Sequence, residues 1–135
     1  MPHLPRILLV ADSADEREMY ATTFQREGFC TLLAGTASEA YRLATELLPA
    51  AVVTDIRLSG SEDGLELTRR LRLSPAMRTT PVVMLTGCVF SHDREAAVRA
   101  GCDVFLPKPC LPDALSSVVA RLLDRRGPET SAQLS

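Results

Sequence analysis

Short apolar runs alternate along the chain with segments of helical periodicity, and this alternation constrains the fold more than any other feature. The runs have the length of single strands and little polar interruption, which is typical of strands covered on both faces of a sheet. They occupy residues 6–11, 30–35, 50–55, 80–87 and 103–107. The pattern predicts an α/β fold with a five-stranded parallel sheet, right-handed crossovers and helices on both faces.

The segments between the runs predict five helices, and local sequence marks several of their ends. We expect helices over 13–29, 36–49, 64–73, 91–101 and 111–126. Thr36 and Glu39 have the spacing of a capping box at the start of the second helix. Gly28 and Gly101 stand where the first and fourth helices should stop.

Length and composition predict one domain, residues 1–126, followed by a polar and disordered tail, 127–135. The net charge of -2 and the absence of a basic face argue against nucleic acid and against an anionic membrane surface as partners. The apolar runs are too short to cross a bilayer. The four cysteines lack metal-ligand spacing, so free thiols in a cytoplasmic protein are expected.

Polar residues follow four of the five predicted strands. Asp12 comes after the first strand, Asp55 ends the third, Thr86 ends the fourth, and Lys108, the only lysine in the chain, follows the fifth. Each has an ordinary explanation alone: a helix cap, a turn residue, a β-former and a solvated charge. Ligands of parallel sheets bind at the carboxyl ends of the strands, so the convergence of all four favours a functional site.

This set of groups suits phosphoryl transfer to a carboxylate. Paired carboxylates and a backbone carbonyl suit Mg²⁺, a hard cation that prefers oxygen ligands. An aspartate can act as the nucleophile and form an aspartyl phosphate. A cation and an ammonium group then offset the charge of the phosphoryl oxygens.

Several stretches, "ILLVAD", "AVVTDIRLSG", "DGLELTRRLR", "PVVMLTG" and "AAVRAGCDVFLPKP", resemble the receiver domain of two-component response regulators. The resemblance covers residues 5–126 and implies a flavodoxin-like sheet with strand order 2-1-3-4-5. It implies that Asp55 is the phosphoacceptor. It also implies that Asp12, Asp55 and the backbone carbonyl of Arg57 hold Mg²⁺.

The same resemblance assigns the remaining site residues. Thr86 would contact the phosphoryl group through its hydroxyl, and Lys108 would pair with the phosphoryl oxygens. Phe105 would be the aromatic switch, and the Lys108–Pro109 bond would be a cis peptide. A receiver of this kind is not an enzyme with a separate substrate, since it catalyses only its own phosphorylation and dephosphorylation.

Two positions depart from the family pattern. Receivers carry two adjacent acids after the first strand, whereas Ala11 replaces the first of them here. Loss of such an outer acid costs about 10–100-fold in metal affinity, and Asp15 or Glu16 could compensate from the first helical turn. Ser59 replaces a usual proline in a loop one residue longer than the commonest form.

The leading hypothesis is a stand-alone receiver that accepts a phosphoryl group on Asp55 from a histidine kinase or a histidine phosphotransfer protein. Its output partner would bind the face formed by 91–101, 103–107 and 111–126, and a homodimer is left open. The alternative is a pseudo-receiver, an interaction adaptor that works without phosphorylation, for which Ala11 is the main support. A phosphatase of the haloacid-dehalogenase type would need a second acid in Asp12-Ser13-Ala14.

Overall fold

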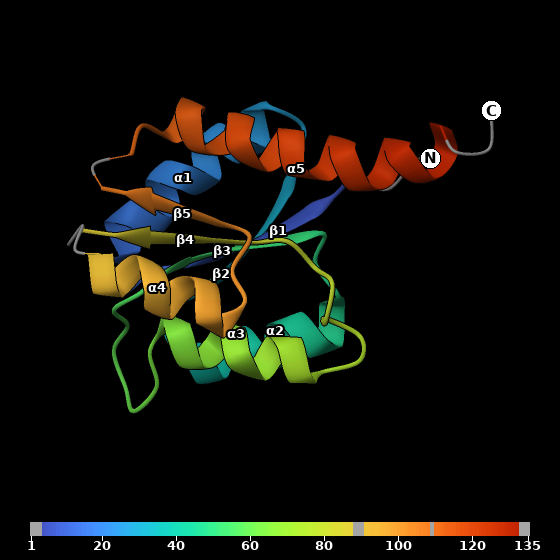
Figure 1. Ribbon diagram of the computed structural model, residues 1–135. Helices are drawn as coiled ribbons and strands as arrows, with labels where there is room; N and C mark the ends of the chain where they lie inside the picture. Colours follow the sequence, from blue (N-terminus) through green and yellow to red (C-terminus); the bar gives the residue numbers. More distant parts are fainter. Residues whose placement is uncertain (1–3, 88–90, 109, 133–135) are drawn as a thin grey trace.

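Strands and helices alternate throughout the computed structural model, which describes residues 4–87, 91–108 and 110–132 (Figure 1). The strands are β1 (Arg6–Val10), β2 (Cys30–Ala34), β3 (Ala51–Asp55), β4 (Val82–Thr86) and β5 (Val104–Pro107). The helices are α1 (Ala14–Arg26), α2 (Ala37–Leu47), α3 (Gly64–Leu73), α4 (Ser91–Ala100) and α5 (Pro112–Ala132).

All paired strands are parallel, in the order β2-β1-β3-β4-β5, which confirms the predicted fold. α1 and α5 cover one face of the sheet, and α2, α3 and α4 cover the other (Figure 1). The register places Val10 opposite Thr54 and Thr86 opposite Pro107. The carboxyl ends of β1, β3, β4 and β5 therefore meet at one edge of the sheet.

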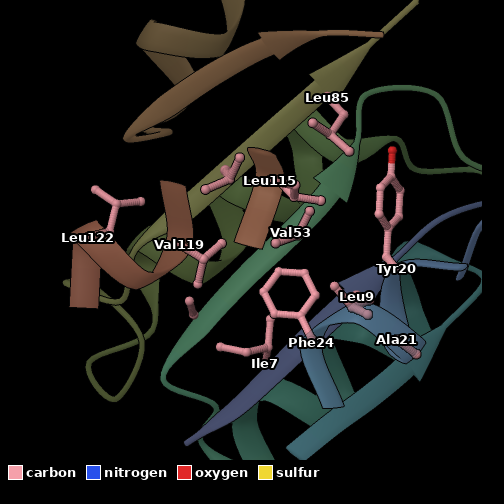
Figure 2. Packing of buried hydrophobic residues seen from close by; sticks show 12 residues of the cluster. Ile7, Leu9, Tyr20, Ala21, Phe24, Val53, Leu85, Leu115, Val119 and Leu122 are labelled. Atoms are coloured by element: carbon pink, nitrogen blue, oxygen red, sulfur yellow. The ribbon is translucent and has the colours of Figure 1, made fainter. Parts of the chain in front are cut away.

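The core has a layer on each face because the central strands are buried on both sides. On the α1/α5 face, Phe24 of α1 lies among residues of the sheet and of α5, including Val53 and Leu115 (Figure 2). On the opposite face, α2 contributes only alanines to the buried layer, Ala37, Ala40 and Ala44. This two-sided burial explains why the strands are visible in the sequence as continuous apolar runs.

The helix starts differ in detail from the sequence predictions. Ser13, not Asp12, caps α1 by accepting a hydrogen bond from the N–H of Glu16 at 3.2 Å. Thr36 caps α2 as predicted, but Glu39 accepts from the N–H of Gly35 rather than closing the capping box on Thr36. A complete capping box occurs instead in α3, between Asp63 and Glu66. Asp12 is thus left without a capping role.

The predicted helix stops at the two glycines are confirmed. Gly28 follows the end of α1 with φ +94°, and Gly101 follows α4 with φ +104°. L-residues with a side chain rarely adopt this left-handed region, so glycine ends a helix there at little cost.

The last helix is longer than predicted. α5 continues past Arg126 and ends at Ala132, so the segment expected to form a disordered tail begins as helix. Gly127 and Pro128 are weak helix formers, which is why the sequence predicted an earlier end. A residue with an N–H that is added to an existing helix gains a hydrogen bond without a new nucleation cost, although Pro128 itself donates none. The last turns of α5 project beyond the sheet (Figure 1).

Arg72 of α3 joins three segments at the amino-terminal edge of β4 and β5. Its guanidinium donates to the carbonyls of Gly101 at 2.8 Å and Thr80 at 2.7 Å, and pairs with Asp103 at 2.9 Å. Asp103 also accepts from the N–H of Val82 at 2.8 Å. This network fixes the entry of both strands at the edge opposite the predicted site.

Two predictions from composition concern cysteine and membranes. Cys30, Cys102 and Cys110 are free thiols, while Cys88 lies outside the described residues. In the ranges given above, none of the helices has both the length and the apolar character needed to cross a bilayer.

Candidate functional site

Three of the four polar residues predicted to converge line one surface cavity at the carboxyl edge of the sheet. Asp55 ends β3, Thr86 ends β4 and Lys108 follows β5 directly. Together with Arg57, Leu85 and Gly87 they line a cavity of about 320 Å³. Asp12 follows β1 at the same edge but is not among the lining residues, and its carboxylate contacts Ser59 instead.

Asp55 is a buried carboxylate, with only 5% of its surface exposed. Its Oδ1 lies 2.9 Å from Nζ of Lys108 and has no hydrogen-bond partner among the described residues beyond this ion pair. Burial raises the pKa of Asp55 to about 7, and the nearby Glu16 carboxylate adds to the rise while Lys108 opposes it. The carboxylate is therefore costly to ionise without a further cation.

Gly64 fixes the backbone that carries Asp55. The N–H of Gly64 donates to the carbonyl of Ile56 at 2.7 Å. A Cβ at position 64 would lie 2.1 Å from the carbonyl oxygen of Asp55, so no side chain fits without displacing that backbone. The first turn of α3 thus packs directly against the end of β3.

Both the backbone and the side-chain ammonium of Lys108 are held by neighbouring groups. Its backbone N–H donates to the carbonyl of Thr86 at 2.7 Å, which continues the pairing of β4 with β5. Its Nζ lies 2.9 Å from Asp55 Oδ1 and 2.9 Å from Glu16 Oε2. Burial acts to lower the pKa of Lys108, but the hydrogen bonds to Glu16 and Asp55 outweigh it and raise that pKa. The ammonium form is favoured at neutral pH.

Glu16 is the site residue that sequence reasoning did not assign. Asp15 and Glu16 were equivalent candidates to compensate for Ala11, but only Glu16 turns into the site, where 19% of its side chain is exposed. Asp15 is exposed to solvent. The cap Ser13 sets which side of α1 each acid occupies, but no local sequence signal shows that the side of Glu16 is the one that faces Lys108.

Ser59, in the loop between β3 and α3, holds the Asp12 carboxylate. The Oδ1 of Asp12 accepts hydrogen bonds from both the backbone N–H, at 3.2 Å, and the hydroxyl of Ser59. A proline at position 59 could donate neither bond, so the departure from the family pattern has a structural role here. The Arg17 guanidinium donates to the carbonyls of Ala11 and Asp12 and holds the chain that follows β1.

The oxygen donors at this edge fit Mg²⁺, although the part of the chain described here has no cluster of three metal-ligating His, Cys, Asp or Glu side chains. Mg²⁺ keeps several waters and is commonly held by one or two carboxylates. Asp55 Oδ1 lacks a partner other than Lys108 among the described residues, and Asp12 is exposed at the same edge. These are the donors expected of a site completed by the carbonyl of Arg57.

Thr86 and Phe105 lie on neighbouring strands beside Asp55. Thr86 is buried at the end of β4. The Phe105 ring of β5 is half-buried against Met84 and Ala97, and the guanidinium carbon of Arg94 lies 5.5 Å from its centroid. Pro109, and with it the predicted cis peptide, lies outside the described residues.

Comparison with known proteins identifies the family to which this arrangement belongs. The sequence profile of the response regulator receiver domain matches residues 7–120. The chain belongs to the response regulator receiver domain family. Receiver domains of this family serve two-component systems, and the fold, with its acids and lysine at the carboxyl edge of the sheet, agrees with that membership.

Individual relatives support the same assignment. The chain is 35% identical over 127 residues to response regulator Rre1 of Synechocystis, covering 93% of this chain and 54% of that protein. It is 33% identical over 130 residues to the DNA-binding response regulator MtrA of Mycolicibacterium paratuberculosis, covering 96% and 56%. The chain therefore spans about half the length of these two curated relatives.

Solved structures share the receiver fold. A CheY-like response regulator receiver domain protein from Methanospirillum hungatei has a TM-score of 0.84 and 26% identity, covering 94% of this chain and 99% of that one. The signal receiver domain of a histidine kinase from Syntrophus aciditrophicus has a TM-score of 0.83 and 31% identity, covering 91% and 92%.

Proposed function

We propose that this receiver accepts a phosphoryl group on Asp55 from a histidine kinase or a histidine phosphotransfer protein and thereby changes its affinity for an output partner. The observation that carries the proposal is the buried Asp55 carboxylate, ion-paired to Lys108 at 2.9 Å on the wall of an open cavity. The sequence prediction of a stand-alone regulator stays a prediction.

The transfer requires an in-line attack by a carboxylate oxygen of Asp55 on phosphorus. A P–O bond forms while the P–N bond to the donor's imidazole breaks, and the bonding electron pair returns to that nitrogen. Lys108 offsets the charge on the phosphoryl oxygens, because its ammonium already lies beside the nucleophile. Thr86, buried on the neighbouring strand, supplies a hydroxyl to the same cavity.

Asp12, Asp55 and the carbonyl of Arg57 would hold Mg²⁺, which supplies charge neutralisation at the phosphoryl oxygens when bound. The high pKa of Asp55 supports the need for such a cation, since Lys108 alone does not offset the cost of burial. Ser59 keeps Asp12 in place through two hydrogen bonds to one carboxylate oxygen. The other oxygen, Oδ2, accepts neither of these hydrogen bonds.

The output would arise on the face formed by α4, β5 and α5. Thr86 and Phe105 stand on adjacent strands, and the Phe105 ring lies under Arg94 of α4. A change at Thr86 on phosphorylation would therefore reach α4 through the Phe105 ring. This is a two-state switch biased by a local change in charge.

Incubation with acetyl phosphate and Mg²⁺ tests the proposal. We expect one added phosphoryl group by intact mass spectrometry in the wild-type chain and in the control Asp15→Asn, and none in Asp55→Asn. Omission of Mg²⁺ should suppress the reaction. Phosphorylation that persists in Asp55→Asn would contradict the assignment of the acceptor.

The alternative is a phosphorylation-independent adaptor, and one observation favours it. Ala11 is a buried alanine at the position of an acid, which removes one oxygen donor from the site. A Mg²⁺ titration distinguishes the two functions. Absence of binding in the millimolar range, together with no phosphoryl transfer, would favour the adaptor.

A further inference from the structure

Glu16 has an unusual orientation for its position in a helix. It is the third residue of α1 after the cap Ser13, so the segment Ser13–Glu16 has the sequence of a capping box. In such a box the glutamate turns back onto backbone N–H groups at the helix start. Here both carboxylate oxygens face Lys108 instead, with Oε1 at 3.1 Å and Oε2 at 2.9 Å from Nζ.

The other helices of the same fold provide an internal comparison. Glu39 of α2 and Glu66 of α3 occupy the same third position after their caps. Glu39 accepts from the N–H of Gly35 at 2.9 Å, and Glu66 accepts from the N–H of Asp63 at 3.2 Å. Glu16 therefore gives up a local backbone contact for a partner 92 residues away.

A second contact of α1 reaches the same loop. Tyr20, one helical turn after Glu16, donates its hydroxyl to the carbonyl of Cys110 at 3.3 Å. In Figure 2 this hydroxyl points away from Phe24 and out of the apolar cluster. Glu16 and Tyr20 thus lie on one side of α1 and contact the chain on either side of Pro109. The Glu16–Lys108 ion pair is therefore one of two contacts between α1 and the chain after β5, and not an isolated ion pair on the surface.

Because position 11 has no acid, Glu16 is the third carboxylate of the site. Ala11 leaves Asp12 after β1 and Asp55 at the end of β3 as the acids of these two strands, and Glu16 adds a third carboxylate from α1. That carboxylate lies on the lysine, while Asp12 lies on Ser59. The third acid of the site therefore acts on the ammonium group.

We propose that Glu16 is a positioning residue for Lys108: it holds the ammonium group beside Asp55 and competes with a phosphoryl group for it. The competing half of this proposal rests on the proposed phosphoacceptor function. A phosphoryl group on Asp55 would need the same ammonium protons that Glu16 now accepts. It would also lie close to a like charge, which disfavours it.

Two measurements on three proteins test the proposal: wild type, Glu16→Gln and the matched control Asp15→Asn. Both variants remove one negative charge from the first turn of α1, but only Glu16 contacts Lys108. The first measurement is the rate at which an amine-acylating reagent modifies Lys108 in EDTA, followed by peptide mass spectrometry. Because Lys108 is the only lysine, its product is unambiguous. The second is the affinity for beryllofluoride, a phosphoryl analogue, in saturating Mg²⁺.

We expect Lys108 in Glu16→Gln to react roughly three- to tenfold faster than in wild type, because one of its two ion pairs is lost. Beryllofluoride should bind this variant roughly three- to thirtyfold more tightly. Asp15→Asn should stay within about twofold of wild type in both measurements. A thermal melt checks that all three proteins are folded.

The outcomes separate the two proposals. Equal acylation rates in Glu16→Gln and Asp15→Asn would overturn the positioning role. Weaker beryllofluoride binding by Glu16→Gln would overturn the competing role and assign the acid to the cation instead. Faster acylation in Glu16→Gln with no beryllofluoride binding by any of the three proteins would support the Glu16–Lys108 contact while contradicting the phosphoacceptor function.

Discussion

Replacing Asp55 by asparagine should stabilise the metal-free fold at pH 8 and lose this advantage in acid. Asp55 is buried, and its pKa rises from 3.8 to about 7 in the folded chain. Between these values the folded state binds more protons than the unfolded state. The free energy of unfolding of the wild type therefore falls as pH rises through this window, and stability present below pH 4 is lost above pH 7. The asparagine side chain carries no charge, so the variant escapes this loss.

The magnitude follows from the size of the shift. One group contributes at most about 1.4 kcal/mol per pH unit, so a shift of about three units sets an upper bound near 4 kcal/mol. The stability gain of Asp55→Asn should be smaller than this bound, because solvent reaches the cavity mouth and because the substitution removes the ion pair with Lys108. Lys108 still keeps its ion pair with Glu16. We expect a gain of about 1–3 kcal/mol at pH 8. For 135 residues this corresponds to a rise in Tm of about 3–10 °C.

Urea unfolding followed by circular dichroism, in EDTA at pH 4.5 to 8, measures this effect. The control Asp15→Asn removes an exposed acid and should shift stability by less than about 0.5 kcal/mol at any pH. Added Mg²⁺ should stabilise the wild type but not Asp55→Asn, because a cation that binds only the folded state stabilises it. A stability difference between wild type and Asp55→Asn that is absent at pH 8, or that does not narrow toward pH 4.5, would refute the reasoning.

Three further substitutions, one of them with a matched control, follow from the contacts described above. Gly64→Ala should destabilise the fold by about 2–4 kcal/mol and slow phosphorylation, because its Cβ meets the Asp55 carbonyl. The control Gly87→Ala should be near neutral by urea unfolding, since no atom of the described residues lies within 4 Å of a Cβ at that position. Arg72→Ala should cost about 2–4 kcal/mol in the same assay with phosphorylation unchanged, and a smaller loss would contradict its role in joining β4 and β5. Lys108→Arg should fold with a stability within about 1 kcal/mol of wild type but bind beryllofluoride weakly, because the broad, planar guanidinium does not fit where the compact ammonium group lies. Beryllofluoride binding equal to that of wild type would count against this reasoning.

The central strands β1, β3 and β4 could be predicted from sequence because they are buried on both faces and therefore appear as apolar runs, while the less buried edge strands β2 and β5 keep the same apolar composition. The edge that carries the site followed from the same alternation, since Asp55 and Thr86 end their strands. Helix ends were less predictable. Ser13 and Asp12 are both good caps, and only the three-dimensional path after β1 selects Ser13. The continuation of α5 past Arg126 likewise overrides weak local propensity.

Glu16 could not be assigned from sequence for a physical reason. Three glutamates, Glu16, Glu39 and Glu66, occupy the same position in their helices, and local rules predict the same backbone contact for each. What separates them is a cation delivered by a loop 92 residues further along the chain. Local propensity carries no information about such a contact, so the structure was needed to find it.

The position of the third acid decides whether its negative charge lies near the cation or near Lys108. An acid at position 11 would stand next to Asp12 in the chain and would add negative charge on the cation side. Glu16 instead adds that charge on the lysine side, at 2.9 Å from Nζ. Two sites with equal formal charge would then differ in behaviour: this one should bind Mg²⁺ more weakly and hold its unphosphorylated lysine more firmly. Affinity for the cation and affinity for the phosphoryl group would accordingly be lowered at different positions, the first by Ala11 and the second by Glu16.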